Sequence, residues 1–217
     1  VSRTGYTGDL GYEIWCDAAA AVKVWDALMA AGKAWSIRPA GMLALDVVRL
    51  EAGLILLEVD YTSSRHALIP DQAYSPGEIG LGGFVDLGKA ADFVGRRALA
   101  AEAARGGPAR RLVGLELEWA GIETLYAAQG LSPTAPAAVS RAAVPLFEAG
   151  GGRQLGRVTS TGWSPILKTA IALGSVPTSH AAVGTRVAVE WTVEGRRGRV
   201  PATVVPTPFL DLPRKRG

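Results

Sequence analysis

The residues with the clearest chemical interest lie in the opening run, which reads SRTGYTGDLGYEI from position 2. Three evenly spaced glycines predict a backbone that turns tightly before a strand begins at about Leu10. Side chains alternate along a strand, so Glu13 and Trp15 are expected to share one face. A carboxylate accepts two parallel N–H bonds from a planar amidine-like edge, and Tyr6 or Trp15 offers a stacking surface for a flat heterocycle.

Two interpretations of this strand are open. A pterin ring presents the flat, N–H-bearing edge that Glu13 would bind. A glutamate after an aromatic residue on an antiparallel strand is, however, commonly just the solvated face of that strand. Spacing alone favours this second interpretation, so support for the first has to come from motifs elsewhere in the chain.

Two helices are predicted after the opening run. Apolar residues recur at helical spacing from 18 to 32, which predicts an amphipathic helix that packs on the first strand. A second helix is predicted over 40–52, because a proline lies near its first turn and a glycine just past its end. It carries Asp46 and Arg49, whose spacing of three allows an ion pair worth about 0.2–0.5 kcal/mol on an exposed surface.

The next segment, 58–74, is polar and rich in turns. A loop of this length inside a compact domain is usually either mobile or functional. Its Arg65 and His66 fit an incidental surface position, and they equally fit a loop that shapes a substrate pocket. Both interpretations remain open at this point.

The sequence changes character after the Gly-Gly-Pro run at 106–108, where short strands alternate with glycine, proline or polar turns. This pattern predicts a small antiparallel barrel or sandwich, and the Gly-Gly-Pro run is the best domain boundary in the chain. The segment 122–141 is rich in proline, alanine and serine, which predicts an irregular connection. The expected strands cover residues 111–118, 156–161, 170–176, 186–193 and 199–205.

Composition limits the class of protein. A single cysteine, Cys16, excludes an internal disulfide and, with only two histidines, a standard structural zinc site. We therefore expect a reducing cytoplasm and no protein-bound metal. The sequence has no apolar run of 18 residues and no basic-then-apolar leader, so we expect no membrane partner. A net charge of +3 is too small to favour nucleic acid as a partner.

Five motifs in the same order resemble the T-protein family of the glycine cleavage system, the folate-dependent aminomethyltransferases. Four of them read SRTGYTGDLGYEI, PAGMLALDVVRLEAG, SPGE followed by IGLGGFV, and DFVGRRAL. The fifth reads GRVTSTGWSPILKTAIALGSVP and carries one extra or shifted residue around Thr161 and Gly162. With GTRVAVEW and VPATVVPTPF near the end, the resemblance spans nearly the whole chain.

The resemblance implies which residues bind tetrahydrofolate. In that family the tyrosine of GYTG and the glutamate that closes the motif contact it, which corresponds to Tyr6 and Glu13 in this sequence. Leu45 stands where the glycine-cleavage enzymes have an arginine that contacts the folate, a charge-assisted contact worth about 1.5–3 kcal/mol. Arg49, one helical turn further along, is the candidate to take over that role.

The resemblance also implies the architecture, an α+β fold. Residues 1–107 are expected to form the C-terminal part of the folate-binding aminomethyltransferase domain, and residues 108–217 a small antiparallel β-barrel domain. The family's catalytic aspartate lies N-terminal to the motifs found here. We therefore expect a chain truncated at its N-terminus, with no catalytic residue of its own and no activity in isolation.

The implied activity is transfer of a methylene group from an aminomethyl donor, held on a lipoyl carrier similar to the H-protein, to tetrahydrofolate. Leu45 and the loop 58–74 keep open an alternative, a folate-dependent demethylase or methyltransferase of a small N-, O- or S-methylated compound. A third possibility is a non-catalytic folate-binding regulator. The KGCYxGQE-type signature of that group is missing, because the sequence has no cysteine at the corresponding place.

Overall fold

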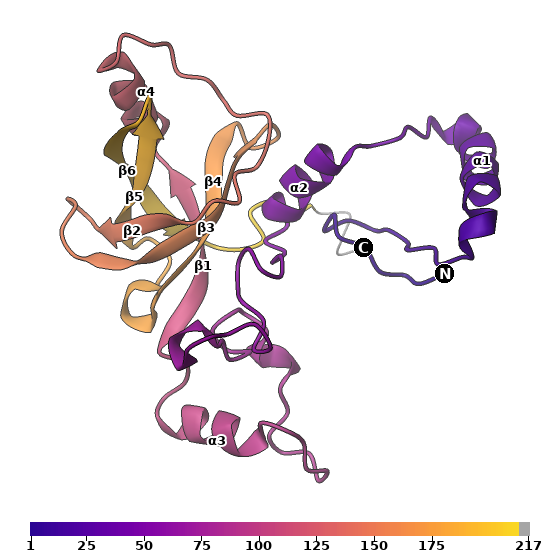
Figure 1. Cartoon of the computed structure of the whole chain (residues 1–217), viewed down its shortest axis with the longest axis horizontal. Helices are drawn as coiled ribbons and strands as arrows, with labels where there is room; N and C mark the ends of the chain where they lie inside the picture. Colours follow the sequence, from indigo (N-terminus) through magenta and orange to yellow (C-terminus); the bar gives the residue numbers. More distant parts are fainter. Residues whose placement is uncertain (213–217) are drawn as a thin grey trace.

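The C-terminal half of the chain forms a closed six-stranded antiparallel β-barrel in a computed structural model that describes residues 1–212 (Figure 1). Neighbouring strands follow the order β1-β4-β3-β2-β5-β6, and β6 pairs with β1 to close the barrel. This confirms the predicted α+β fold with an antiparallel barrel. The strands are β1 (Arg110–Leu117), β2 (Val144–Glu148), β3 (Gln154–Ser164), β4 (Thr169–Pro177), β5 (Arg186–Val193) and β6 (Arg196–Val205).

Aliphatic side chains from the strands fill the barrel, as alternation along each strand requires. Five of these side chains, each from a different strand, are fully buried at 0% exposure: Leu115, Leu146, Val158, Val189 and Val200. Helix α4 (Trp119–Ala127) packs against β5 and β6 and adds the fully buried Ile122 to the same cluster. Burial of this cluster is the main stabilising contribution to the barrel.

Two elements of the barrel domain differ from the prediction. The segment 122–141 was expected to be irregular throughout, but it begins inside α4, so that expectation was wrong for its first residues. The strand β2 was not predicted, because its five residues contain a proline and lie between segments rich in alanine and glycine. The other five strands are confirmed to within a few residues at each end.

The N-terminal half contains three α-helices and little other regular structure: α1 (Ala21–Gly32), α2 (Met42–Glu51) and α3 (Arg96–Ala104). Short 3-10 turns lie at Ala18–Ala20, Lys33–Trp35, Pro70–Gln72 and Gly82–Phe84. Helix α2 packs against β3 and β4, whereas α1 and α3 stand apart from the barrel in Figure 1. None of the helices in residues 1–212 combines the length and apolarity needed to cross a membrane.

The strand predicted from Leu10 does not form. Residues 1–16 have irregular backbone with one bridge, in which Ser2 and Glu13 exchange two N–H···O bonds of 2.9 Å. A strand needs a hydrogen-bonded neighbour along its length, and in the described part of the chain this run finds one only at Ser2. The predicted packing of the first helix on that strand is therefore also wrong, and no residue of α1 is buried.

Large apolar side chains are exposed throughout this half of the molecule. Trp15 is 81% exposed, Trp35 87% and Phe84 88%. Apolar patches that are larger than usual on a monomer mark surfaces that contact another molecule or another part of the same assembly. The barrel thus holds most of the core, and α2 is the helix through which the N-terminal half joins it.

Candidate functional site

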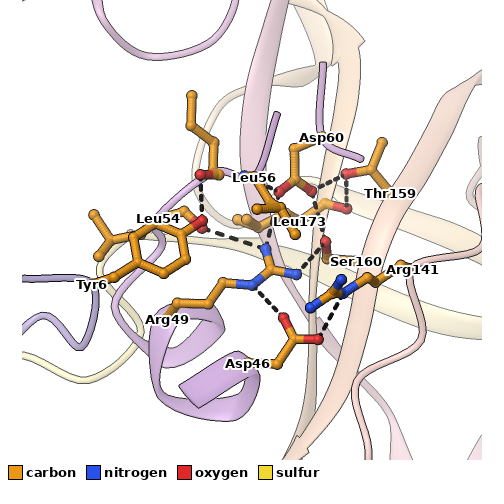
Figure 2. Close-up of polar contacts among 11 residues, drawn as sticks. Tyr6, Asp46, Arg49, Leu54, Leu56, Asp60, Arg141, Thr159, Ser160 and Leu173 are labelled. Carbon is orange, nitrogen blue, oxygen red and sulfur yellow. Dashed lines mark hydrogen bonds and ion pairs between the residues drawn. The ribbon is translucent and has the colours of Figure 1, made fainter. Parts of the chain in front are cut away.

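Arg49 occupies the centre of the contact between α2 and the barrel (Figure 2). Its side chain is 0% exposed, and all three of its nitrogens donate hydrogen bonds. Nε donates to Oδ1 of Asp46 at 2.8 Å, and Nη1 donates to Oδ2 of Asp60 at 2.9 Å and to the Leu54 carbonyl at 3.3 Å. Nη2 donates to Oγ of Ser160 at 2.9 Å.

Asp60 is the second fully buried charge, and it lies in the loop that was expected to be a mobile or functional surface. Its Oδ2 accepts from Arg49 and, at 2.8 Å, from the Leu56 N–H. Its Oδ1 accepts the hydroxyl of Thr159 at 2.6 Å and that of Ser160 at 2.7 Å. Four hydrogen bonds hold this carboxylate, which is the condition under which a buried charge is tolerated.

A β-bulge in β3 makes this arrangement possible. The pairing of β3 with β4 shifts between Val158 and Ser160, so one residue of β3 is extra. Successive side chains normally point to opposite faces of a strand, but a bulge re-aims one of them. The hydroxyls of Thr159 and Ser160 therefore reach the same oxygen of Asp60. The bulge lies close to the point around Thr161 and Gly162 where the sequence motif carries one extra or shifted residue.

Asp46 closes the cluster on its outer side. Its carboxylate is 6% exposed and accepts from Nε of Arg49 and from Nε of Arg141, the latter at 2.8 Å. Burial opposes ionisation and is the largest single effect, but the hydrogen bonds and charges of the two arginines together outweigh it. The pKa of Asp46 consequently lies below its ordinary value. The cluster carries two arginines and two aspartates, so its formal charge is balanced.

The depressed pKa of Asp46 predicts how acid affects stability. A carboxyl whose pKa is lower in the folded state stabilises the fold above its unfolded pKa of about 3.9, and this contribution is lost as the pH falls through the folded pKa. We expect the free energy of unfolding of the wild type to fall as the pH is lowered from about 4. The free energy of unfolding of Asp46→Asn should fall less steeply over the same range. Urea denaturation at a series of pH values measures both. Equal slopes for the two proteins below pH 4 would contradict the assignment.

Tyr6 lies next to this cluster and contacts the same stretch of backbone. Its half-buried hydroxyl donates to the Ile55 carbonyl at 2.5 Å (Figure 2). Burial raises the pKa of Tyr6 above 10.0; the positive charge of Arg49 opposes the rise, and the negative charge of Asp60 adds to it. Tyr6 is therefore a neutral donor near pH 7, with its proton committed to the protein. Its ring face is the part left for a ligand.

Glu13 lies away from the cluster. Its carboxylate is exposed and accepts the hydroxyl of Thr4, and no contact joins it to Tyr6 or Arg49 within residues 1–212. The structure thus brings together two of the three residues expected at the folate, Tyr6 and Arg49. The roles of all three in ligand binding stay predictions.

Arg49 has a different role in the geometry from the one expected. A guanidinium that is 0% exposed and bonded through every nitrogen has no donor to offer a ligand without breaking a buried ion pair. We therefore favour a positioning role for Arg49 over direct contact with a folate. The estimate for an exposed Asp46–Arg49 pair does not apply either, because the pair is buried.

A cavity of about 450 Å³ lies along the face of α2 next to Tyr6's loop. Thr7 and Asp9 of that loop line it together with Leu45, Val48 and other residues of α2 and its ends. The C-terminal domain contributes Ile166, Leu210 and Leu212 to the cavity. Its walls are mainly apolar, and none of its described lining residues is a lysine, arginine or histidine. This volume lies within the usual range for small-molecule sites. Leu45, the residue expected at the family's arginine position, thus lines a cavity.

Four residues of the cluster were missed by sequence reasoning: Asp60, Arg141, Thr159 and Ser160. A run of three hydroxyl residues, 159–161, was the available signal for the last two, together with the extra residue noted near them. Asp60 sits in a polar loop and Arg141 in a segment expected to be irregular. Neither position distinguishes a buried charge from a surface one.

The fold and site define an α+β protein in which a closed antiparallel barrel is joined to a helical segment through buried ion pairs. A family profile for the GCVT N-terminal domain matches residues 1–89, and one for the glycine cleavage T-protein C-terminal barrel domain matches residues 110–211. The chain belongs to the glycine cleavage T-protein family. The domain limits predicted at 107 and 108 fall between the two matches and stay a prediction.

Similar proteins of known name match over almost the whole chain. An aminomethyltransferase of Symbiobacterium thermophilum is 40% identical over 100% of this chain and 49% of its own length. An aminomethyltransferase of Bacillus cytotoxicus is 36% identical over 96% of this chain and 48% of its own length. A trimethylamine-oxide aldolase of Ruegeria pomeroyi is 42% identical over 97% of this chain and 23% of that protein.

A solved structure shares the fold. The crystal structure of glycine cleavage system aminomethyltransferase T from Bartonella henselae superposes with a TM-score of 0.71 at 29% identity, covering 96% of this chain and 48% of that one. The chain spans about half the length of the aminomethyltransferases it matches and about a quarter of the aldolase.

Proposed function

We propose that the protein transfers a one-carbon unit to tetrahydrofolate, in the manner of an aminomethyltransferase. The observation that carries the proposal is that aminomethyltransferases align with this chain over 96–100% of its length at 36–40% identity. The cavity beside the GYTGD loop supports it, because a mainly apolar space of about 450 Å³ suits the body of a flat heterocycle. The donor in this proposal is an aminomethyl group on a carrier similar to the H-protein.

The chain's own residues would bind and orient the folate. Glu13 would accept N–H bonds from the pterin edge, and the ring of Tyr6 would pack against its face, since the Tyr6 hydroxyl is engaged elsewhere. No residue of this chain is assigned a chemical step.

Titration and a donor assay of the full-length protein test the proposal. Tetrahydrofolate is expected to bind by calorimetry, and aminomethyl-lipoyl carrier is expected to yield ammonia and methylene-tetrahydrofolate. Absence of tetrahydrofolate binding would contradict the proposal as a whole. Binding without turnover of any one-carbon donor would instead favour a folate-binding regulator.

The second candidate is a folate-dependent enzyme that demethylates a small N-methylated compound. It is favoured by the 42% identity with a protein whose name states that it acts on trimethylamine oxide. The absence of a lysine or arginine from the described lining of the Leu45 cavity is consistent with a neutral or cationic substrate. Assaying the same preparation with trimethylamine N-oxide in place of the carrier separates the two candidates.

Leu45→Arg is a further test of the cavity. The new guanidinium would line the cavity and offer its N–H groups to a bound folate. We expect the dissociation constant of tetrahydrofolate to fall about tenfold, since a charge-assisted hydrogen bond is worth about 1.5–3 kcal/mol. The matched control is Leu43→Arg on the same helix, where the leucine is 64% exposed and does not line the cavity. An equal change in both variants would contradict a specific effect at position 45.

A further inference from the structure

The backbone segment 54–56 is held by side chains through three consecutive groups. Its first carbonyl, at residue 54, accepts from Arg49 at 3.3 Å. The Ile55 carbonyl accepts the Tyr6 hydroxyl at 2.5 Å. The Leu56 N–H donates to Asp60 at 2.8 Å. Figure 2 shows these contacts around one short stretch of chain. Any displacement of the segment therefore moves the anchor of the Tyr6 ring.

The barrel fixes the other end of this chain of contacts. Asp60 uses one oxygen for the segment and Arg49, and the other for the hydroxyls of Thr159 and Ser160 in the β3 bulge. Asp60, Arg49, Thr159 and Ser160 are each 0% exposed, so water does not compete for these hydrogen bonds. The contacts run without a gap from the bulge to Tyr6, although more than 150 residues of sequence separate the two.

We propose that the hydroxyls of Thr159 and Ser160, acting through Asp60, position Tyr6 for its ligand. The barrel domain in this way helps to place a residue of the proposed ligand site through contacts inside the protein. The identity of the ligand rests on the function proposed above, whereas the placement of Tyr6 does not. Displacement of a positioned group by about 1 Å can cost a hundredfold in rate, so a small relaxation of the segment is expected to be measurable.

The test removes both hydroxyls with little change in shape, in the double variant Thr159→Val/Ser160→Ala of the full-length protein. Tyr6 is followed by fluorine NMR after labelling with 3-fluorotyrosine, and its resonance is assigned with Tyr6→Phe. We expect that resonance to move toward the position of free fluorotyrosine, and the dissociation constant of tetrahydrofolate to rise about tenfold.

Ser175→Ala is the matched control. Ser175 is a barrel hydroxyl that is 2% exposed and accepts from Arg110, outside the contacts that lead to Tyr6. Its loss is expected to lower stability while leaving the Tyr6 resonance and the affinity unchanged. A general loosening of the barrel would move the Tyr6 resonance in both variants and would overturn the proposal.

A double-mutant cycle separates positioning from independent effects. In a Tyr6→Phe background the anchor is already lost, so the bulge variant should weaken tetrahydrofolate binding by much less than tenfold. Additive effects, or an unchanged Tyr6 resonance in the bulge variant, would overturn the proposal. If the double variant does not fold, Ser160→Ala alone keeps one hydroxyl on Asp60 and gives the same readouts. If the wild type binds no tetrahydrofolate, the proposed function fails, and the resonance still decides the placement of Tyr6.

Discussion

Arg49→Ala is expected to lower the free energy of unfolding by about 3–5 kcal/mol, the cost of removing one partner from a buried ion pair. The loss leaves Asp60, which is 0% exposed, without its only cationic partner in the described part of the chain. It also removes the hydrogen bonds to Leu54 and Ser160. Urea denaturation at pH 7 measures the change directly.

The control for this prediction is a second arginine in an exposed pair. Arg153 bonds Glu148 at 3.0 Å, with side chains that are 72% and 38% exposed, so Arg153→Ala should cost under about 1 kcal/mol. Arg49→Lys is expected to lie between the two, because lysine keeps the charge but not the planar fork of donors. If Arg49→Ala were no less stable than Arg153→Ala, the buried cluster would not be what holds α2 on the barrel.

The second large effect is expected at Glu13. Glu13→Gln should raise the dissociation constant of tetrahydrofolate ten- to a hundredfold, because the charge-assisted hydrogen bonds proposed for the pterin edge are worth about 1.5–3 kcal/mol. Stability should change little, since the side chain is exposed and its one described side-chain partner is Thr4. Calorimetric titration of the full-length protein provides the measurement.

An exposed glutamate elsewhere provides the comparison. Glu194 lies in the turn between β5 and β6, far along the chain from the opening run, and Glu194→Gln should leave affinity unchanged. Equal affinities for wild type and Glu13→Gln would remove Glu13 from the ligand site. Tyr6 and the cavity beside Leu45 would then be the remaining candidates.

Much of the barrel was predictable because its strands obey local rules. β6 alternates in burial over its second half, β5 carries a run of β-branched residues, and a two-residue turn separates them, so composition and turn together mark both strands. β2 is too short for its alternation to stand out, and α4 overlaps the start of a segment whose proline, alanine and serine content indicated an irregular connection. The prediction of an opening strand was wrong for a different reason. A strand forms only where a neighbouring segment pairs with it, and the residues of the run do not show whether such a neighbour exists.

The site was predictable only where its contacts are local. Asp46 and Arg49 are three residues apart on one helix, and their pair follows from helical geometry. Ser160 lies 111 residues from Arg49, and its direction depends on a bulge that alternation alone does not indicate. Sequence spacing therefore identified the ion pair but gave neither its burial nor the carboxylate of Asp60.

The exposed tryptophans and Phe84 of the N-terminal half have a practical consequence for handling the 217-residue chain by itself. Side chains of this size in contact with solvent bind hydrophobic dyes and promote self-association, and precipitating salts such as sulfate strengthen that tendency. Light scattering at low and high sulfate would therefore be a sensible first check on any preparation, before a weak signal in a binding assay is attributed to the barrel or to Tyr6.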